Sequence, residues 1–99
     1  MGKLVRDKIP EIIESAGGQP DFRVLAGSEL QSALKAKLVE EAKEAHAASD
    51  GELLEELADV HEVMAGILAY MGWSETDLRR VAHEKRIARG GFDEGYYLE

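Results

Sequence analysis

Residues 40–59 read EEAKEAHAASDGELLEELAD, and this stretch decides the fold of the chain. It contains two acidic signatures, Glu41-x-x-Glu44 and Glu56-x-x-Asp59, with the turn-like sequence Ser-Asp-Gly between them. Carboxylates spaced three or four residues apart lie on the same side of a helix, where like charges repel one another. We therefore expect a compensating cation, and hard divalent ions such as Mg²⁺ prefer carboxylate oxygens.

Long amphipathic helices are expected on both sides of this turn. Residues 28–48 and 52–71 each have apolar residues at every third or fourth position. The two stripes are Leu30, Leu34, Leu38, Ala42 and Ala45, and then Leu53, Leu57, Val60, Met64, Ile67, Leu68 and Met71. Glu41 lies inside the first stripe, so its side chain should point toward the core. Two antiparallel helices joined by a tight turn would bring both acidic pairs face to face as four inward carboxylates.

A solvated acidic surface is the alternative interpretation. The chain has 20 acidic residues among 99, so that the spacing also occurs by chance, as in Glu11/Glu14 and Glu52/Glu55. One such pair means little. Two pairs on consecutive helices, one of them within an apolar stripe, favour a metal site, because buried carboxylates without compensation are energetically costly.

The composition bounds the class of protein. Ninety-nine residues are expected to form one domain, residues 1–99, with a modest core. The absence of cysteine excludes disulfides, thiol catalysis and cysteine-ligated zinc, and it is compatible with a reducing cytosol. We expect a cytoplasmic protein, because no apolar run resembles a signal peptide or a membrane span. A net charge of −8 disfavours binding to nucleic acid or to an anionic membrane.

Basic residues gather at both ends of the chain, away from the acidic centre. They are Lys3, Arg6 and Lys8 at the start, and Arg79, Arg80, Lys85, Arg86 and Arg89 near the end. Of these, Arg79, Arg80 and Lys85 could simply solvate the final helix. The sequence Arg89-Gly90-Gly91 would let backbone N–H groups approach an anion, or would end the helix as a C-cap, and both interpretations can hold.

The predicted architecture is mainly α, with a four-helix bundle and minor extended segments. The predicted helices cover residues 7–16, 28–48, 52–71 and 74 to about 89. Asp7 is expected to cap the first helix, and Ser74 with Asp77 the last one. Residues 3–5, 22–25 and 96–98 are β-prone. The last two of these segments could pair with each other or pack on a partner chain.

Taken together, these residues resemble the all-α nucleoside triphosphate pyrophosphohydrolase superfamily, the MazG-like proteins. The superfamily pattern is E-E-x-x-E followed by E-x-x-D, and the sequences Glu40-Glu41-Ala42-Lys43-Glu44 and Glu56-Leu57-Ala58-Asp59 meet it. The start of the chain, KLVRDKIP, and its end, with Lys85 and the sequence RGGF, resemble a subgroup called phosphoribosyl-ATP pyrophosphohydrolase-like. The resemblance covers most of the chain, and it is much more specific for the superfamily than for a substrate.

The resemblance implies a MazG-like bundle, assembled as a homodimer or homotetramer, and an enzyme that uses Mg²⁺, for which Mn²⁺ could substitute. The reaction would be hydrolysis of a normal or noncanonical nucleoside triphosphate between the α and β phosphates, to a monophosphate and pyrophosphate. The implied metal ligands are Glu41, Glu44, Glu56 and Asp59. Glu40, together with Glu41, is the catalytic candidate, as a base or an orienting group. The phosphate-tail candidates are Lys85 and Arg89, followed by Arg6 and Lys8.

Three alternatives stay open at this point. The chain could be a noncatalytic module that binds metal or nucleotide, or a plain helical assembly protein with solvated acids. It could also be a phosphoribosyl-ATP pyrophosphohydrolase of histidine biosynthesis, although its two ends fit the subgroup named above better.

Overall fold

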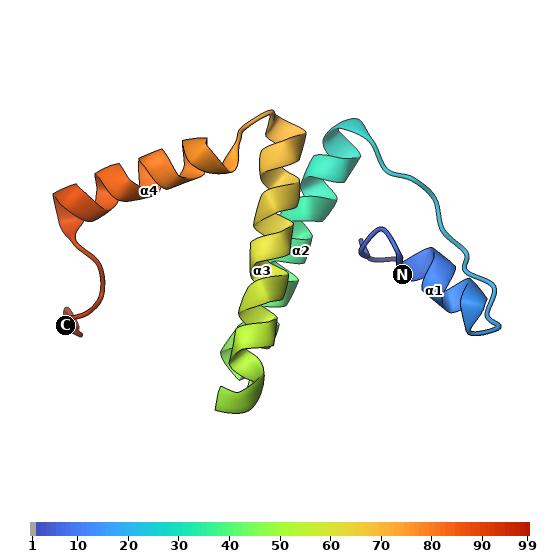
Figure 1. The fold of residues 1–99 in the computed structure, drawn as a ribbon, viewed down its shortest axis with the longest axis horizontal. Coiled ribbons are helices and arrows are strands. Elements are labelled where there is room, and N and C mark those ends of the chain that lie inside the picture. Colours follow the sequence, from blue (N-terminus) through green and yellow to red (C-terminus); the bar gives the residue numbers. More distant parts are fainter. Residues whose placement is uncertain (1) are drawn as a thin grey trace. The chain divides into compact units, whose positions relative to one another are not determined.

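The computed structural model describes residues 2–99, which form four helices and no strand (Figure 1). The helices are α1 (Ile9–Ser15), α2 (Gly27–Ala47), α3 (Asp50–Met71) and α4 (Glu75–Arg89). The prediction of a mainly α fold is therefore confirmed. None of these helices is both long enough and apolar enough to span a bilayer, within residues 2–99. The chain divides into two compact units, one running to Ile67 and the other covering Leu68–Glu99, and each is described by itself. The prediction of a single domain stays a prediction.

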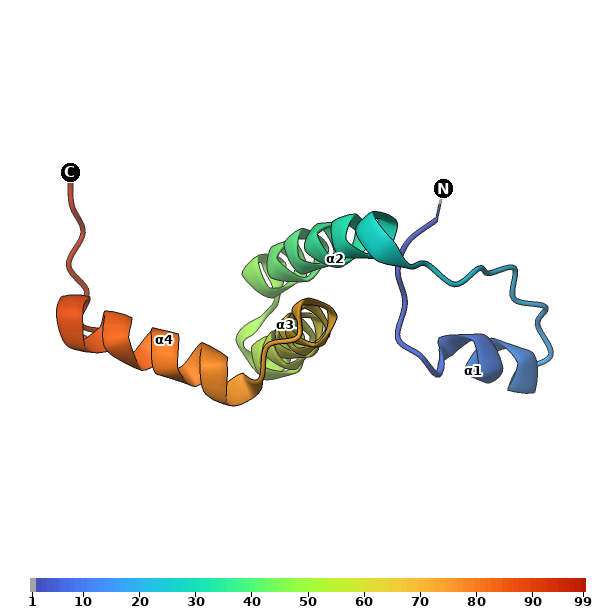
Figure 2. The same ribbon diagram turned by 90° about the horizontal axis from the view of Figure 1, so that it is seen from above.

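A helical hairpin dominates the first unit. Helices α2 and α3 lie side by side in both views (Figures 1 and 2), and only Ala48 and Ser49 connect them. The predicted turn is thus shorter than expected, because Asp50 already begins α3. The helices approach closely at Gly66, where a Cβ atom would lie 3.1 Å from Cδ2 of Leu34. Gly66 therefore lets the two backbones come together at this point of the hairpin.

The core of this hairpin is thin. Val63 of α3, at 8% exposure, is the one apolar residue that counts as buried among residues 2–99. Several larger apolar side chains on the same helix are exposed, including Leu53, Leu54 and Leu57. The hairpin alone therefore does not bury the apolar stripe that its sequence carries.

The start of α1 differs from the prediction. Asp7 does not cap the helix: Lys8 occupies the N-cap position, without a side-chain cap hydrogen bond. A turn precedes the helix, in which the Ile9 N–H donates to the carbonyl oxygen of Arg6 over 3.0 Å. Pro10 then lies in the first helical turn, where its missing N–H costs nothing. The local turn and the proline together move the start of the helix past Asp7.

The β-prone segments form no strands within residues 2–99. Residues 22–25 are held by another contact. Arg23 donates to both carboxylate oxygens of Glu29 in the first turn of α2, over 3.0 and 2.6 Å. This hydrogen-bonded pair lowers the pKa of Glu29 and raises the pKa of Arg23. The segment is thereby tied to the start of a helix instead of to a sheet.

Both ends of α4 agree with the prediction. The Ser74 hydroxyl accepts from the Asp77 N–H at 3.1 Å, and the Asp77 carboxylate accepts from the Ser74 N–H at 2.8 Å, which makes a capping box. The hydrogen bond from the Ser74 backbone, followed by the one from its hydroxyl, lowers the pKa of Asp77. At the other end, Gly90 has a φ of 80° and its N–H donates to Arg86 over 2.7 Å. Gly90 therefore acts as the C-cap.

Candidate metal centre

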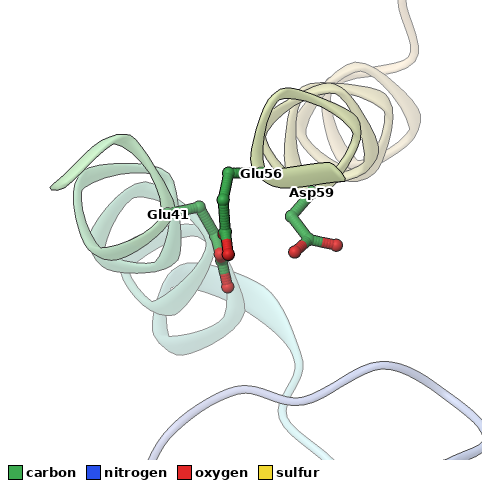
Figure 3. A group of neighbouring side chains, drawn as sticks. All are labelled: Glu41, Glu56 and Asp59. Atoms are coloured by element: carbon green, nitrogen blue, oxygen red, sulfur yellow. The ribbon is translucent and has the colours of Figure 1, made fainter. Parts of the chain in front are cut away.

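Three of the four predicted metal ligands meet between α2 and α3. Glu41, Glu56 and Asp59 each offer a carboxylate oxygen, and these oxygens all lie within 4.8 Å of one another. Figure 3 shows Glu41 on one helix facing Glu56 and Asp59 on the other. The spacing of three residues puts Glu56 and Asp59 on one side of α3. The hairpin connection then brings Glu41 opposite them.

Burial distinguishes this cluster from a solvated acidic surface. Glu41 is 8% exposed, as its place in the apolar stripe predicts. The Oε2 atoms of Glu41 and Glu56 are both buried and neither has a hydrogen-bond partner. In Figure 3 the carboxylates of these two residues point into the same space. A buried ionised oxygen without a partner is costly, so these two oxygens suit a cation with oxygen ligands, such as Mg²⁺.

Glu44, the fourth predicted ligand, lies beside the cluster, outside the group of three. Its exposed carboxyl is next to that of Glu41. The pKa of Glu44 is raised, first by the hydrogen bond to Glu41 and by its charge, then by burial and by the charges of Glu56 and Glu40. A hydrogen bond between two carboxyls needs a proton on one of them. With both ionised, Glu44 adds repulsion to the cluster.

Lys37 is a member of the site that the sequence analysis missed. Its Nζ atom lies 3.2 Å from Oε1 of Glu41 and 3.4 Å from Oε2 of Glu40. Partial burial acts to lower the pKa of Lys37, but the hydrogen bonds and charges of Glu41 and Glu40 outweigh it, and the pKa is raised. The available signal was the spacing, because Lys37 precedes these two acids by three and four residues on a predicted helix.

Two cations reach the cluster from the N-terminal segment. Arg6 donates to Oδ1 of Asp59 over 2.6 Å, and Lys3 lies 3.9 Å from Oε1 of Glu40. The predicted phosphate ligand Arg6 is thus at the site, bonded to a predicted metal ligand. A cavity of about 240 Å³ lies between this segment and α2, where Lys3, Lys37 and Glu40 line it.

The other predicted phosphate ligands belong to helices α1 and α4. Lys8 is exposed at the N-cap position of α1. Lys85 and Arg89 are exposed on the last turns of α4, in the unit Leu68–Glu99, whereas the carboxylates belong to the other unit. A Cβ atom on Gly91 would lie 3.5 Å from the Arg86 guanidinium. Arg86, rather than Arg89, therefore lies beside Gly91, whereas a Cβ atom on Gly90 would meet nothing within 4 Å.

Comparison with known proteins adds one relative. No family model matches the chain, and no solved structure matches it. The chain is similar to an uncharacterized protein of Mycolicibacterium smegmatis, with 50% identity over 48 residues. The match covers 48% of this chain and 49% of that protein, so the two share about half of their lengths.

Proposed function

We propose that the chain is a Mg²⁺-dependent hydrolase that cleaves a nucleoside triphosphate between its α and β phosphates. The metal-dependent part of this proposal is supported by one observation above all: the Oε2 atoms of Glu41 and Glu56 are buried without a hydrogen-bond partner, on carboxylates that point into the same space near Asp59. The nucleotide part comes from the resemblance of the two acidic motifs to those of all-α pyrophosphohydrolases.

The charges around the cluster fit a divalent ion. Five carboxylates, of Glu40, Glu41, Glu44, Glu56 and Asp59, stand against three cations, those of Lys3, Arg6 and Lys37, which leaves a formal charge of −2. One divalent ion would neutralise this charge. Glu41, Glu56 and Asp59 would hold the ion, with Glu44 next to them. Such an ion polarises phosphoryl oxygens and stabilises the charge that develops on the leaving pyrophosphate.

The remaining groups have roles around the phosphates. Arg6 lies against Asp59, where its guanidinium can pair with phosphate oxygens near a metal ligand. Lys3, which lines the cavity, can do the same as a point charge. Glu40 is the candidate base: it would take a proton from the water whose oxygen bonds to phosphorus, while the bridging oxygen leaves with pyrophosphate.

A panel of substrates tests the proposal. The purified protein is incubated with Mg²⁺ and with normal and modified nucleoside triphosphates or phosphoribosyl-ATP, and the products are separated by chromatography. We expect a monophosphate and pyrophosphate, and loss of both products in Glu56→Gln but not in Glu55→Gln, which changes a neighbouring exposed residue. Release of orthophosphate alone, or equal activity of the two variants, would contradict the proposal.

A second function, a noncatalytic module that binds Mg²⁺ and nucleotide, is favoured by the surroundings of Glu40. Both of its oxygens lie near ammonium groups, Oε1 near Lys3 and Oε2 near Lys37. Both oxygens that could accept a proton from water are therefore already paired with cations. Saturable nucleotide binding in the presence of Mg²⁺, without turnover of any substrate in the panel, would establish this second function.

We also propose that the chain self-associates, with a second copy of itself as the partner. Leu54 is 78% exposed and Leu57 is 48% exposed on α3, although both occur in a helix with a long apolar stripe. Two helices with one buried apolar residue form an incomplete core, and two such hairpins can close a four-helix bundle. The apolar face of α3 therefore supports a symmetric dimer.

A further inference from the structure

Lys37 is the most shielded cation at the carboxylate cluster. Its side chain is 15% exposed, compared with 55% for Arg6 and 67% for Lys3. Ion pairs that are partly removed from water are screened less than exposed pairs. The contact of Lys37 with Oε1 of Glu41, at 3.2 Å, therefore restrains that carboxylate more than a surface contact would.

The two oxygens of Glu41 have different surroundings. Oε1 lies against Lys37, whereas Oε2 is buried without a partner, as is Oε2 of Glu56. The carboxylates of Glu41 and Glu56 point into the same space between α2 and α3 (Figure 3). A divalent ion on Oε2 of Glu41 would thus leave Lys37 in place on Oε1, so the lysine and the ion do not need the same oxygen.

We propose that Lys37 is a positioning residue of the metal centre, which holds Oε1 of Glu41 so that Oε2 faces Glu56 and Asp59, both before and after an ion binds. This inference rests on the proposed metal centre. Groups that orient a ligating carboxylate commonly change metal affinity by about 10- to 100-fold when they are removed. The same ammonium also holds Glu40, so it sets the orientation of two consecutive acids of α2.

Simple electrostatics gives the opposite expectation, which makes the inference testable. Lys37 carries a positive charge beside the site and repels a divalent ion. If repulsion were its only effect, removal of Lys37 would tighten Mg²⁺ binding. If positioning dominates, removal weakens binding. The sign of the change in affinity therefore separates the two roles.

Titration calorimetry with Mg²⁺ measures this sign on the full chain, in wild type, Lys37→Met, Lys37→Arg and Lys43→Met. Lys43→Met is the matched control, because Lys43 is an exposed residue of the same helix and its substitution removes the same charge. We expect the Kd for Mg²⁺ to rise by about 10-fold or more in Lys37→Met, to be partly restored in Lys37→Arg, and to be unchanged or lower in Lys43→Met. Equal or tighter binding by Lys37→Met would overturn the inference. An absence of Mg²⁺ binding by the wild type would instead overturn the proposed function.

Nuclear magnetic resonance of the lysine ammonium groups tests the contact of Lys37 with Glu41 directly. The measurement is made on the protein with and without Mg²⁺. Ammonium protons exchange quickly with water unless they are hydrogen-bonded and shielded. We expect a slowly exchanging Lys37 signal in the metal-free protein and in the Mg²⁺-saturated protein, and none from Lys43. Absence of the Lys37 signal without Mg²⁺ would refute the contact with Glu41. Its disappearance on addition of Mg²⁺ would show that the ion displaces the lysine, and would overturn the inference.

Discussion

Arg6 and Asp59 are 53 positions apart in the chain, and Nη2 of Arg6 lies 2.6 Å from Oδ1 of Asp59. This contact brings the N-terminal segment to the edge of the carboxylate cluster. Both side chains are more than one third exposed. The pair therefore matters more for where the segment lies, and for the charge near the cluster, than for the stability of the fold.

Replacing Arg6 tests whether the ion pair matters more for the site than for the stability of the fold. Arg6→Gln should lower the free energy of unfolding by at most about 1 kcal/mol, because an exposed ion pair is screened by solvent. The same variant should lower kcat/KM for a nucleoside triphosphate by about 10-fold, as expected when one charged contact to phosphate is lost. Urea unfolding and steady-state kinetics measure the two effects. Lys35→Gln, which removes the same charge from an exposed site on α2, should have neither effect, and an equal kinetic loss there would contradict the role of Arg6.

Glu56→Gln should change stability in opposite directions with and without Mg²⁺. In the metal-free protein the amide removes a buried negative charge and can donate to Oε2 of Glu41, which should stabilise the fold by about 1 kcal/mol. In wild type, Mg²⁺ at 100 times its Kd should add about 2.7 kcal/mol, and the variant should lose this gain. Thermal unfolding with and without Mg²⁺ measures both effects, with Glu55→Gln as the control. A full Mg²⁺ effect in Glu56→Gln would exclude this residue as a ligand.

The raised pKa of Glu44 predicts that the stability of the metal-free protein depends on pH. Its pKa in the folded protein is raised above the ordinary value of 4.5 by its contact with Glu41. A raised pKa contributes stability below the ordinary pKa, and this contribution is lost as pH rises through the folded-state value. Glu44→Gln should therefore be more stable than wild type at neutral pH, and the advantage should vanish as pH falls to about 4. Chemical unfolding between pH 7 and about 4 measures the difference in free energy of unfolding between the variant and wild type. A difference that grew toward low pH would contradict the prediction.

Ser74→Ala tests the capping box of α4. The variant loses the hydroxyl that accepts from the Asp77 N–H, at a typical cost of about 1 kcal/mol in helix stability. Hydrogen exchange of the amides in the first turn of α4 should be faster than in wild type. Thr76→Ala is the matched control, because it removes a hydroxyl two residues further along the chain that does not cap the helix. Equal exchange in Ser74→Ala and wild type would show that the cap contributes nothing in solution.

Leu54→Asp tests self-association. The side chain is 78% exposed, so the substitution should leave the helix content unchanged in circular dichroism. If a second copy covers this face, the buried charge should shift a dimer to monomer in sedimentation velocity, because an unpaired charge in an apolar interface is costly. Thr76→Asp, which adds the same single negative charge at an exposed position of α4, controls for the change in charge. A monomeric wild type would reject the dimer.

The sequence predicted long elements well because their signals repeat. The apolar stripes of α2 and α3 extend over several turns, so their ends were correct within about two residues, and the burial of Glu41 followed from its place in the first stripe. Short segments were less certain. The predicted cap at Asp7 was wrong, and the β-prone residues 22–25 form no strand, since local contacts of a few residues decide such segments.

Contacts between distant parts of the chain were the other limit. No periodicity could show that Arg6 would meet Asp59, because that contact depends on the path of the whole N-terminal segment. Lys37 was missed for a different reason. Lys37 precedes the acidic stretch that begins at Glu40, although a lysine four residues before Glu41 lies within reach of it on any helix.

The two-residue connection between α2 and α3 also bears on how this chain can change in evolution. Glu41 lies six residues before the end of α2, and Glu56 lies six residues after the start of α3, so both stand about 9 Å along their helices from the connection. An insertion of one residue between either acid and the connection would turn that carboxylate by about 100° away from its partner. Lengthening of the helices at their far ends leaves the positions of the two acids relative to the connection unchanged. Natural variants with the same chemistry should therefore lack single-residue insertions between Glu41 and the end of α2, and between the start of α3 and Glu56.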